Sequence, residues 1–358
     1  MAYTTINKSS LFMNNKLYTG TGATQSITGV GHQPDMVWNK TRTRGGYNHN
    51  LTDSIRGATK VLRPNLGNAE DTISDSLTSF DTDGFTLGAD ASNGETNKSG
   101  DNYASWSWKA GTTTGINNTG STIQPSTNGY SFNQTSGFSI IKYLGNLTSG
   151  AKVPHGLGVA PKMVITKKIG AVNNWVTYHA GVNEGTNPQN YAMSLNYDYA
   201  KDLASYYWNN TAPDAVNFTL GNSNQVNDNS NYHIAYCFAE IPGYSKMGEY
   251  FGNGDTNGTF VYTGFKPAFV MVKRDDTTDN WLIKDIKRDP FNQMAKRIFP
   301  NLSNAEDTSG GGEFDFLSNG FKNRGTNTIN NANGGHYIYM AFAEAPLVGT
   351  NNVPCTAR

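Results

Sequence analysis

The first candidates for catalytic residues are two pairs of adjacent acidic residues. Glu70-Asp71 and Glu306-Asp307 end two stretches that are nearly identical, residues 64–71 and 300–307. Two carboxylates can hydrolyse a glycosidic bond, but only when they face each other across a cleft at about 5–5.5 Å or 6.5–9.5 Å. Neighbouring residues on one chain do not supply that geometry alone. We therefore expect these acids to serve in turns or as helix caps.

A second candidate is Asp81-Thr-Asp83-Gly84, which resembles the start of a calcium loop. In such loops, oxygen ligands alternate before a glycine turn and a bidentate acid follows. That closing acid is missing from this chain. The interpretation we favour is a β-turn over residues 81–84, and we assign no metal ligand there.

Other catalytic patterns are absent from the sequence. The histidines have no metal-ligand spacing, and there is no Gly-x-Ser-x-Gly, Gly-x-x-x-x-Gly-Lys or Cys-x-x-Cys motif. Cys237 is expected in a core strand and Cys355 lies near the end of the chain. This argues against a disulfide framework and favours assembly in a reducing cytoplasm. We expect a protein that is not an enzyme and that binds no cofactor.

Tyrosines in polar segments are the candidates for contact with a partner. They are Tyr47, Tyr103, Tyr130, Tyr197, Tyr199, Tyr206 and Tyr207, which we expect to be exposed. Tyrosine rings can stack on sugar faces while Asn and Asp bond to sugar hydroxyls, and the same residue types build protein interfaces. The sequence leaves both interpretations open, a glycan contact and an interface contact.

The elements that must position these residues occur three times. Each copy starts with Tyr-x-Gly, continues into an apolar strand after a proline and reaches a lysine; the copies are residues 18–40, 143–167 and 250–273. Solenoids repeat over roughly 20–50 residues, whereas these copies recur at about 100 residues, which is the size of a small domain. The chain is therefore expected to be an array of three related domains.

Alternation of apolar residues predicts how the strands are buried. In residues 267–273, Phe269 and Met271 would point to one face and Val270 and Val272 to the other, so this strand should be covered on both sides. Each copy closes on an alternating strand, and in the last two copies that strand ends in Phe-Ala-Glu. Three residues of each closing strand should share one core face: Ala104, Trp106 and Trp108; Ile234, Tyr236 and Phe238; Ile338, Met340 and Phe342.

Two further local expectations follow from residue types. Lys40, Lys167 and Lys273 recur at the end of the proline-led strand and are interpreted as charged residues at the sheet rim. Residues 290–298 are expected to form a short helix capped by Asp289, because apolar residues recur there at helical spacing.

Composition narrows the fold class and the partners. Charged residues make up only 16% of the 358 residues, and Gly, Asn, Thr, Ser, Tyr and Phe are abundant, which is typical of an all-β protein with many turns. Lys+Arg and Asp+Glu balance at 28 each, so no nucleic-acid partner is expected. No apolar run is long enough to span a bilayer and no signal peptide is recognisable, so we expect neither a membrane partner nor secretion.

The boundaries follow from the copies and from changes in composition. We expect three β-sandwich-like domains of jelly-roll or lectin type, with short helices and an extended C-terminal arm. The segments are an N-terminal arm (1–13), the first repeat (14–111), a linker (112–136), the second repeat (137–242), the third repeat (247–346) and the C-terminal arm (347–358).

Several stretches also resemble a known family. They are residues 1–8 (Met-Ala-Tyr-Thr-Thr-Ile-Asn-Lys), 18–35, 54–60 (Ser-Ile-Arg-Gly-Ala-Thr-Lys), 79–88, 236–246 and 347–358. Together with the repeated Tyr-x-Gly and Phe-Ala-Glu signals, they resemble virion structural proteins of tailed phages of marine bacteria, of the cyanophage and pelagiphage type, often described as tail-fibre-like. The resemblance covers nearly the whole chain and brings no catalytic residue with it.

The resemblance implies a location and partners. It implies a non-enzymatic virion protein, assembled in the host cytoplasm, that forms an exposed appendage such as a tail fibre. The expected partners are other virion proteins and further copies of the chain, with a homotrimer favoured. Two alternatives stay open: a capsid decoration or head-fibre protein, and a carbohydrate-binding module that recognises host surface glycans.

Overall fold

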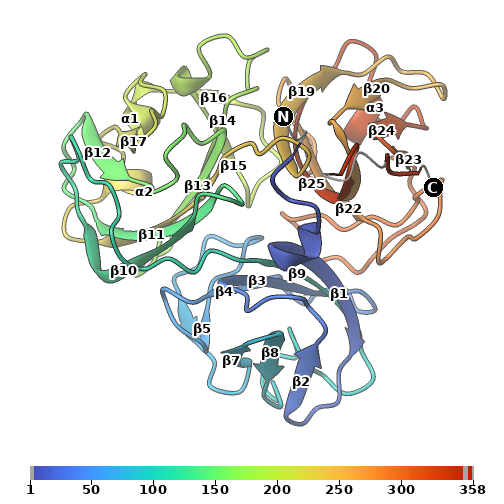
Figure 1. Ribbon diagram of the computed structural model, residues 1–358, viewed down its shortest axis with the longest axis horizontal. Helices are drawn as coiled ribbons and strands as arrows, with labels where there is room; N and C mark the ends of the chain where they lie inside the picture. Colours follow the sequence, from blue (N-terminus) through green and yellow to red (C-terminus); the bar gives the residue numbers. More distant parts are fainter. Residues whose placement is uncertain (1–3, 350–353, 357–358) are drawn as a thin grey trace.

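The protein consists of three lobes arranged around a common centre (Figure 1). The computed structural model describes residues 4–349 and 354–356. Nearly all regular structure in these residues is antiparallel β-sheet, and the three α-helices have four residues each. The all-β class with short helices is confirmed, and each lobe contains one of the three repeats, which we call units 1, 2 and 3.

Each unit combines a larger sheet with a smaller one. Unit 1 follows η1 (Ser9–Leu11) and contains β1 (Met13–Thr19), β2 (Gln25–Thr28), β3 (Met36–Thr41), β4 (Asn50–Asp53), β5 (Lys60–Val61), β6 (Asp71–Thr72), β7 (Leu77–Asp81), β8 (Gly84–Leu87) and β9 (Asn102–Trp108). Unit 2 contains β10 (Pro125–Asn133), β11 (Phe138–Leu144), β12 (Ala151–Pro154), β13 (Met163–Lys168), β14 (Trp175–His179), η2 (Pro188–Asn190), β15 (Tyr191–Ser194), β16 (Asp202–Leu203), α1 (Ser205–Trp208), β17 (Asn217–Leu220), α2 (Asn224–Asn227) and β18 (Tyr232–Phe238). Unit 3 contains β19 (Ser245–Phe251), β20 (Phe260–Tyr262), β21 (Phe265–Arg274), β22 (Leu282–Asp285), β23 (Phe314–Leu317), β24 (Gly320–Asn323), α3 (Thr328–Asn331) and β25 (His336–Pro346).

The larger sheets share one strand order. It is β1-β9-β3-β4 in unit 1, β11-β18-β13-β14 within unit 2 and β19-β25-β21-β22 in unit 3. In every unit the closing strand therefore lies between the Tyr-x-Gly strand and the proline-led strand. The smaller sheets, β2-β8-β7, β12-β17 and β20-β24-β23, complete the two-layered units.

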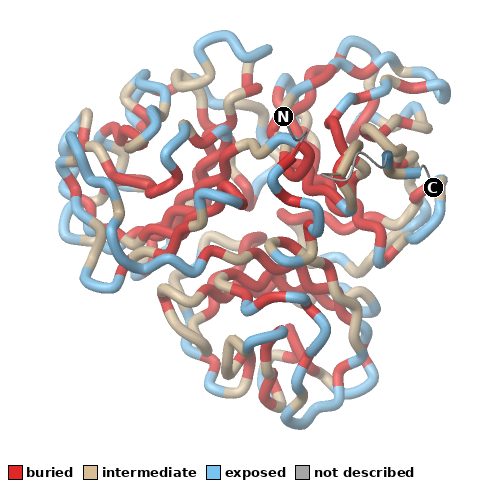
Figure 2. Tube along the Cα trace, viewed as in Figure 1, coloured by how far each residue is buried: buried red, intermediate tan, exposed pale blue. Residues whose placement is uncertain are grey.

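Both faces of the larger sheets are buried, as the alternation predicted. In β21, Phe269 and Met271 belong to a core shared by the three units, whereas Val270 and Val272 belong to the core of unit 3 alone. The same holds in unit 2, where Ile165 faces the shared core and Val164 faces the unit's own core. In Figure 2 the buried residues accordingly follow the inner strands, and exposed residues lie at the periphery.

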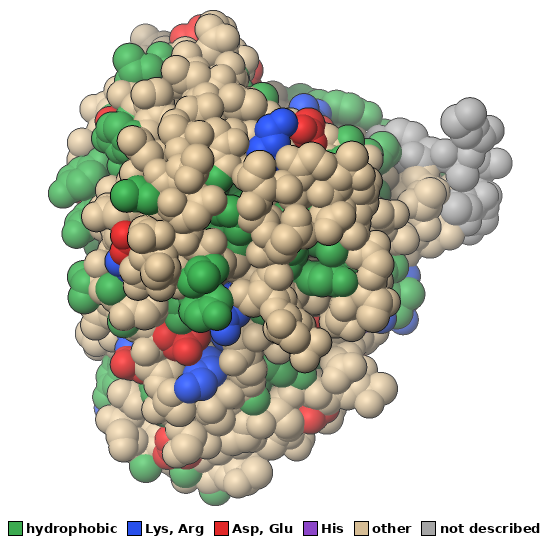
Figure 3. Space-filling model, turned by 90° about the vertical axis from the view of Figure 1, so that its left-hand side faces the viewer, with side chains coloured by type: hydrophobic (Ala, Val, Ile, Leu, Met, Phe, Trp, Pro, Cys, Tyr) green, Lys and Arg blue, Asp and Glu red, His purple; other side chains and the backbone are tan. Residues whose placement is uncertain are grey.

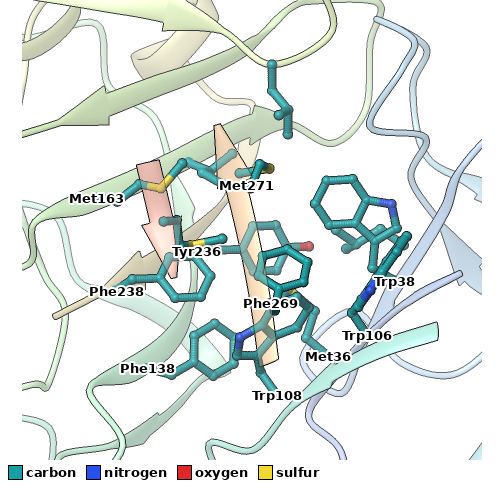
Figure 4. Close-up of a cluster of buried hydrophobic side chains, with 14 of the residues drawn as sticks. Met36, Trp38, Trp106, Trp108, Phe138, Met163, Tyr236, Phe238, Phe269 and Met271 are labelled. Atoms are coloured by element: carbon teal, nitrogen blue, oxygen red, sulfur yellow. The ribbon is translucent and has the colours of Figure 1, made fainter. Parts of the chain in front are cut away.

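The three closing strands meet in the shared core, and Figure 4 shows side chains of β9, β18 and β21 lying against one another there. Trp108, Phe238 and Phe342 occupy the same position in units 1, 2 and 3. The ring centroid of Trp108 lies 6.3 Å from that of Phe238 and 5.8 Å from that of Phe342, and the rings of Phe238 and Phe342 lie 6.2 Å apart. All three contacts are edge-to-face, which is a favoured geometry for aromatic pairs. Ile6, from the segment before the first unit, is buried in the same core.

Equivalent hydrogen bonds connect each unit to the next. The sequence places His49, Trp175 and Trp281 at one position of the repeat, and each ring N–H donates to a backbone carbonyl of a neighbouring unit. The pairs are His49 Nε2 with Phe299 O (3.0 Å), Trp175 Nε1 with Arg63 O (3.1 Å) and Trp281 Nε1 with Ser194 O (3.0 Å). Unit 1 thus donates to unit 3, unit 2 to unit 1 and unit 3 to unit 2, so the three hydrogen bonds form a closed ring.

Two segments differ from the sequence expectations. Residues 125–133, expected within a linker, form β10 and pair with β11, which extends the sheet of unit 2. The helix expected over residues 290–298 was wrong. Met294 bridges to Phe314 and Ile298 bridges to Ile283, so neighbouring strands satisfy the backbone that a helix would have paired internally.

The two ends of the chain were expected to be arms. Residues 4–12 lie against the shared core and are not a free arm, because Ile6 is buried there and Phe12 packs edge-to-face on Tyr244. At the other end, Val348 bridges to Pro354 and the Cys355 amide donates to Leu347 O, so the described residues fold back on themselves. The remainder of both expected arms lies outside the described residues.

Replacing Trp108 by alanine should weaken all three units together. Removing a fully buried aromatic side chain costs about 3–5 kcal/mol, and here the cavity would open against every lobe. Native-state hydrogen exchange should then accelerate in β1, β11 and β19 alike. Tyr232→Ala, at an exposed position, is the control. Acceleration confined to unit 1 would contradict the shared core.

Candidate functional site

The paired acids form ion pairs with arginines, so the turn or capping role expected for them was incomplete. Glu70 Oε2 lies 3.1 Å from Arg56 Nη1, and Glu306 Oε1 lies 2.8 Å from Arg42 Nη2 of unit 1. Asp71 pairs with Arg63 and Asp307 with Arg297, and these two pairs, like that of Glu70 with Arg56, each lie within one unit. The pair of Glu306 with Arg42 joins units 3 and 1. The acids thus stabilise the scaffold.

The Asp81–Gly84 segment is the expected β-turn, between β7 and β8. The carboxylate of Asp83 accepts hydrogen bonds from the amides of Gly29 (3.0 Å) and Gly31 (2.5 Å). These bonds lower the pKa of Asp83. Gly84 has φ of 145°, and a Cβ there would lie 1.9 Å from Ile27 O, so only glycine fits. The residues that resembled a calcium loop therefore join the two strands to β2.

The three equivalent lysines lie in the interior, so placing them at a sheet rim was wrong. Lys40, Lys167 and Lys273 are each 0% exposed. Each ammonium donates to the carbonyl of the following residue, and Lys40 Nζ also donates to Tyr47 O (3.0 Å) and to Ser303 O (3.3 Å). Burial lowers the pKa to about 8 for Lys40, about 7 for Lys167 and about 8 for Lys273. Carbonyl oxygens hold the lysines in place at the strand ends.

The candidate tyrosines divide into buried and accessible ones. Tyr103 and Tyr207 are buried, which contradicts the exposure expected for them. Tyr103 stacks on Tyr18 and donates to Gly94 O, because its ring lies on the face of β9 opposite the shared core. Tyr47 and Tyr130 are half-buried. Tyr47 accepts a hydrogen bond from Lys98 Nζ at 2.8 Å.

The accessible tyrosines gather on one side of unit 2. Tyr199 is 56% exposed, and Tyr197 and Tyr206 are also exposed. The rings of Tyr197 and Tyr199 are stacked, with centroids 4.8 Å apart and planes 8° apart. Tyr206 packs on Tyr207 at 4.5 Å. The tyrosines lie on α1 and on the residues before β16, a strand that pairs with β15 as β6 pairs with β5 in unit 1.

Tyr199 and Tyr207 border a hollow of about 380 Å³, which we call the unit 2 hollow. Its lining combines a floor of small and apolar side chains with polar side chains at its mouth: Asn174, Val176, Ala192, Met193, Ser194, Tyr199, Ala200, Lys201, Asp202 and Tyr207. The sequence analysis found Tyr199 and Tyr207 and missed the others. Aligning unit 2 with units 1 and 3 position by position would have revealed them, but unit 2 lacks the Pro-Asn-Leu stretch that guides such an alignment.

Hydrogen bonds fix the polar groups of the hollow. Asp202 Oδ2 accepts from Tyr206 OH at 3.2 Å, and Asn174 Oδ1 accepts from Asn196 Nδ2 at 3.2 Å. Lys201 Nζ lies 3.9 Å from Asp275 Oδ2 of unit 3. The hydroxyl of Tyr207 accepts from Gln225, and burial raises its pKa. The hollow is thus lined by hydroxyl, amide and carboxylate groups, and among the described residues the Asp202 carboxylate has no cationic partner.

Two other hollows lie in or beside unit 1. One, of about 240 Å³, is lined by Tyr47, Asp90 and Lys98, and the other, of about 800 Å³, by His32, Asp35 and their neighbours. Burial raises the pKa of Asp35 and lowers that of His32 to about 4. Asp35 accepts hydrogen bonds from Ser54, Ser131 and the Ala110 amide, so it joins β10 of unit 2 to unit 1.

Comparison with known proteins gives a family and no function. A family model described as a domain of unknown function, DUF7483, matches residues 8–346, which includes all three units. No curated protein and no solved structure matches the chain. Within residues 4–349 and 354–356, no cluster of three or more His, Cys, Asp or Glu could hold a metal ion, and no helix is long and apolar enough to cross a membrane.

The buried lysines should make stability depend on pH. The pKa of Lys167 is about 7 in the folded protein and ordinarily 10.5. Between these values the unfolded chain binds a proton that the folded chain does not, so the free energy of unfolding should rise with pH, by up to about 1.4 kcal/mol per pH unit. Below pH 7 the cost of burying the charge is present in full.

Lys167→Met isolates this effect, because other titrating groups are common to both proteins. Denaturant unfolding of the two proteins at pH 7, 8 and 9 should show the stability of the native sequence rising relative to that of the variant. Equal pH slopes for the two proteins would contradict a buried lysine with a lowered pKa.

Proposed function

We propose that this chain, which belongs to the DUF7483 family, is a non-enzymatic virion structural protein of a tailed phage. It would form part of an exposed appendage, a tail fibre or a fibre-like component. The proposal rests on the resemblance of the sequence to marine phage virion proteins and on the architecture described above.

The observation that carries the proposal is the closure of three units on one core. Trp108, Phe238 and Phe342 meet at the centre, and side chain to backbone bonds run around the ring of units. In this arrangement three equivalent units pack into one rigid body. A catalytic site, by contrast, needs one location whose side chains differ from those at the equivalent positions. It suits a rigid module of an extracellular particle.

The use of the charged residues supports the same proposal. Asp53 accepts from the amide of Arg56 and from Tyr236 OH of unit 2, and Asp285 accepts from Trp106 Nε1 of unit 1. These two buried carboxylates are thus engaged in holding neighbouring units together. Buried carboxylates in such networks stabilise one arrangement only when all their partners are present.

Association into a homo-oligomer, for which we favour a trimer, is part of the proposal. The apolar inner faces of the larger sheets are already buried within one chain, so copies would associate through their outer surfaces. Sedimentation equilibrium of the purified protein measures the mass directly. A mass of three chains is expected, and a strictly monomeric protein would contradict this part of the proposal.

The location should be tested by immunogold electron microscopy of purified particles of the phage that encodes the chain. Antibody raised against the folded protein should label tail appendages, and preimmune serum is the control. Label over the capsid would instead favour the alternative of a head decoration or head fibre. Particles that carry no label would contradict a virion role.

A further inference from the structure

We propose that the unit 2 hollow binds a neutral saccharide, one pyranose ring lying against Tyr199. The inference deepens the proposed function, because an exposed appendage that binds sugar would contact glycans of the host surface. Three features of the hollow support it: larger described side chains occupy the equivalent space in units 1 and 3, an aromatic ring borders it, and hydrogen-bonding groups line it.

The hollow exists because unit 2 carries small residues where the other units carry large ones. Leu62, Met193 and Ile298 occupy one position, since each pairs with the residue two places after His49, Trp175 or Trp281. The flanking positions are Val61 and Arg63 in unit 1, Arg297 and Phe299 in unit 3, but Ala192 and Ser194 in unit 2. The three carbonyls that accept the inter-unit bonds, of Arg63, Ser194 and Phe299, confirm this register.

In units 1 and 3, the large side chains are fixed by their own partners. Arg63 Nε lies 2.8 Å from Glu95 Oε1, and Glu95 also accepts from Asn48, the equivalent of Asn174. In unit 3, Arg297 pairs with Asp307 and lies over the ring of Phe299, 5.2 Å from its centroid. Among its described residues, unit 2 has no large side chain at these two positions. The backbone is common to the three units, but the small side chains of unit 2 leave this space unfilled.

An exposed aromatic ring at the mouth suggests what fills the space. Tyr199 keeps more than half of its surface in water although it stacks on Tyr197, which holds the ring in a defined orientation. A ring fixed in this way offers a flat apolar surface at a small entropic cost of binding. The C–H face of a pyranose is a flat apolar surface of matching size. The volume of about 380 Å³ lies in the range of small-molecule sites.

The polar groups of the hollow fit hydroxyls better than an anionic ligand. Asp202 and Asn174 offer a carboxylate and an amide that are already oriented by Tyr206 and Asn196. Lys201 lies near Asp275, whereas Asp202 has no cationic partner among the described residues, so its carboxylate would repel an anionic ligand and can accept hydrogen bonds from hydroxyls. The face of unit 2 in Figure 3 is mostly uncharged, with separate hydrophobic side chains and few charged ones. A neutral ligand that both donates and accepts hydrogen bonds satisfies these groups.

Saturation-transfer NMR of the full chain with free monosaccharides tests the proposal. The panel contains neutral hexoses, deoxyhexoses, N-acetylhexosamines and uronic acids at millimolar concentration. At least one neutral sugar should bind saturably. Tyr199→Ala, which removes the stacking surface, should weaken that binding about tenfold. Ser194→Phe, which introduces the residue of unit 3, should abolish it.

Tyr232→Ala is the matched control, because Tyr232 is 47% exposed on the same unit and does not line the hollow. Its affinity for the sugar should equal that of the native protein. The proposal is overturned if no neutral sugar binds, or if binding survives both Tyr199→Ala and Ser194→Phe. Because the isolated chain is used, failure here is distinct from failure of the virion proposal, which the microscopy decides.

Discussion

The structure depends on the edge-to-face contact of Trp108, Phe238 and Phe342. These three residues come from closing strands that are far apart in sequence, and their centroid separations of 5.8–6.3 Å leave no room for solvent at the centre. Each larger sheet therefore has two apolar faces, one for its own unit and one for the other two. A single unit taken out of the chain would expose the second face, a surface that soluble proteins rarely leave open.

The polar contacts between units follow the same threefold pattern, but with different chemistry. Asp53 and Asp285 occupy one position of the repeat and accept hydrogen bonds from Tyr236 and Trp106. Unit 2 has His179 at that position, and it bonds instead to the Tyr339 carbonyl at 3.0 Å. The backbone geometry is thus kept while side chains vary, and such variation produced the unit 2 hollow. Packing restricts side-chain differences between the units at the shared core and permits them on the outer side of each unit.

Much of the fold could be predicted from the sequence, because alternation reports burial directly. The two faces of residues 267–273 and the closing-strand residues were placed correctly. The lysines were misplaced because a charged residue is normally exposed, and only the folded backbone supplies carbonyls to Lys40. The hollow was missed because it arises from the smallness of Ala192 and Ser194, which carry no signal of their own.

The central claim is that the three units form one cooperative body, and differential scanning calorimetry of the intact chain tests it most directly. A shared core couples the unfolding of each unit to that of the others, so the account predicts a single transition with equal calorimetric and van't Hoff enthalpies. Two or three separate transitions, each with the van't Hoff enthalpy of one unit, would contradict it.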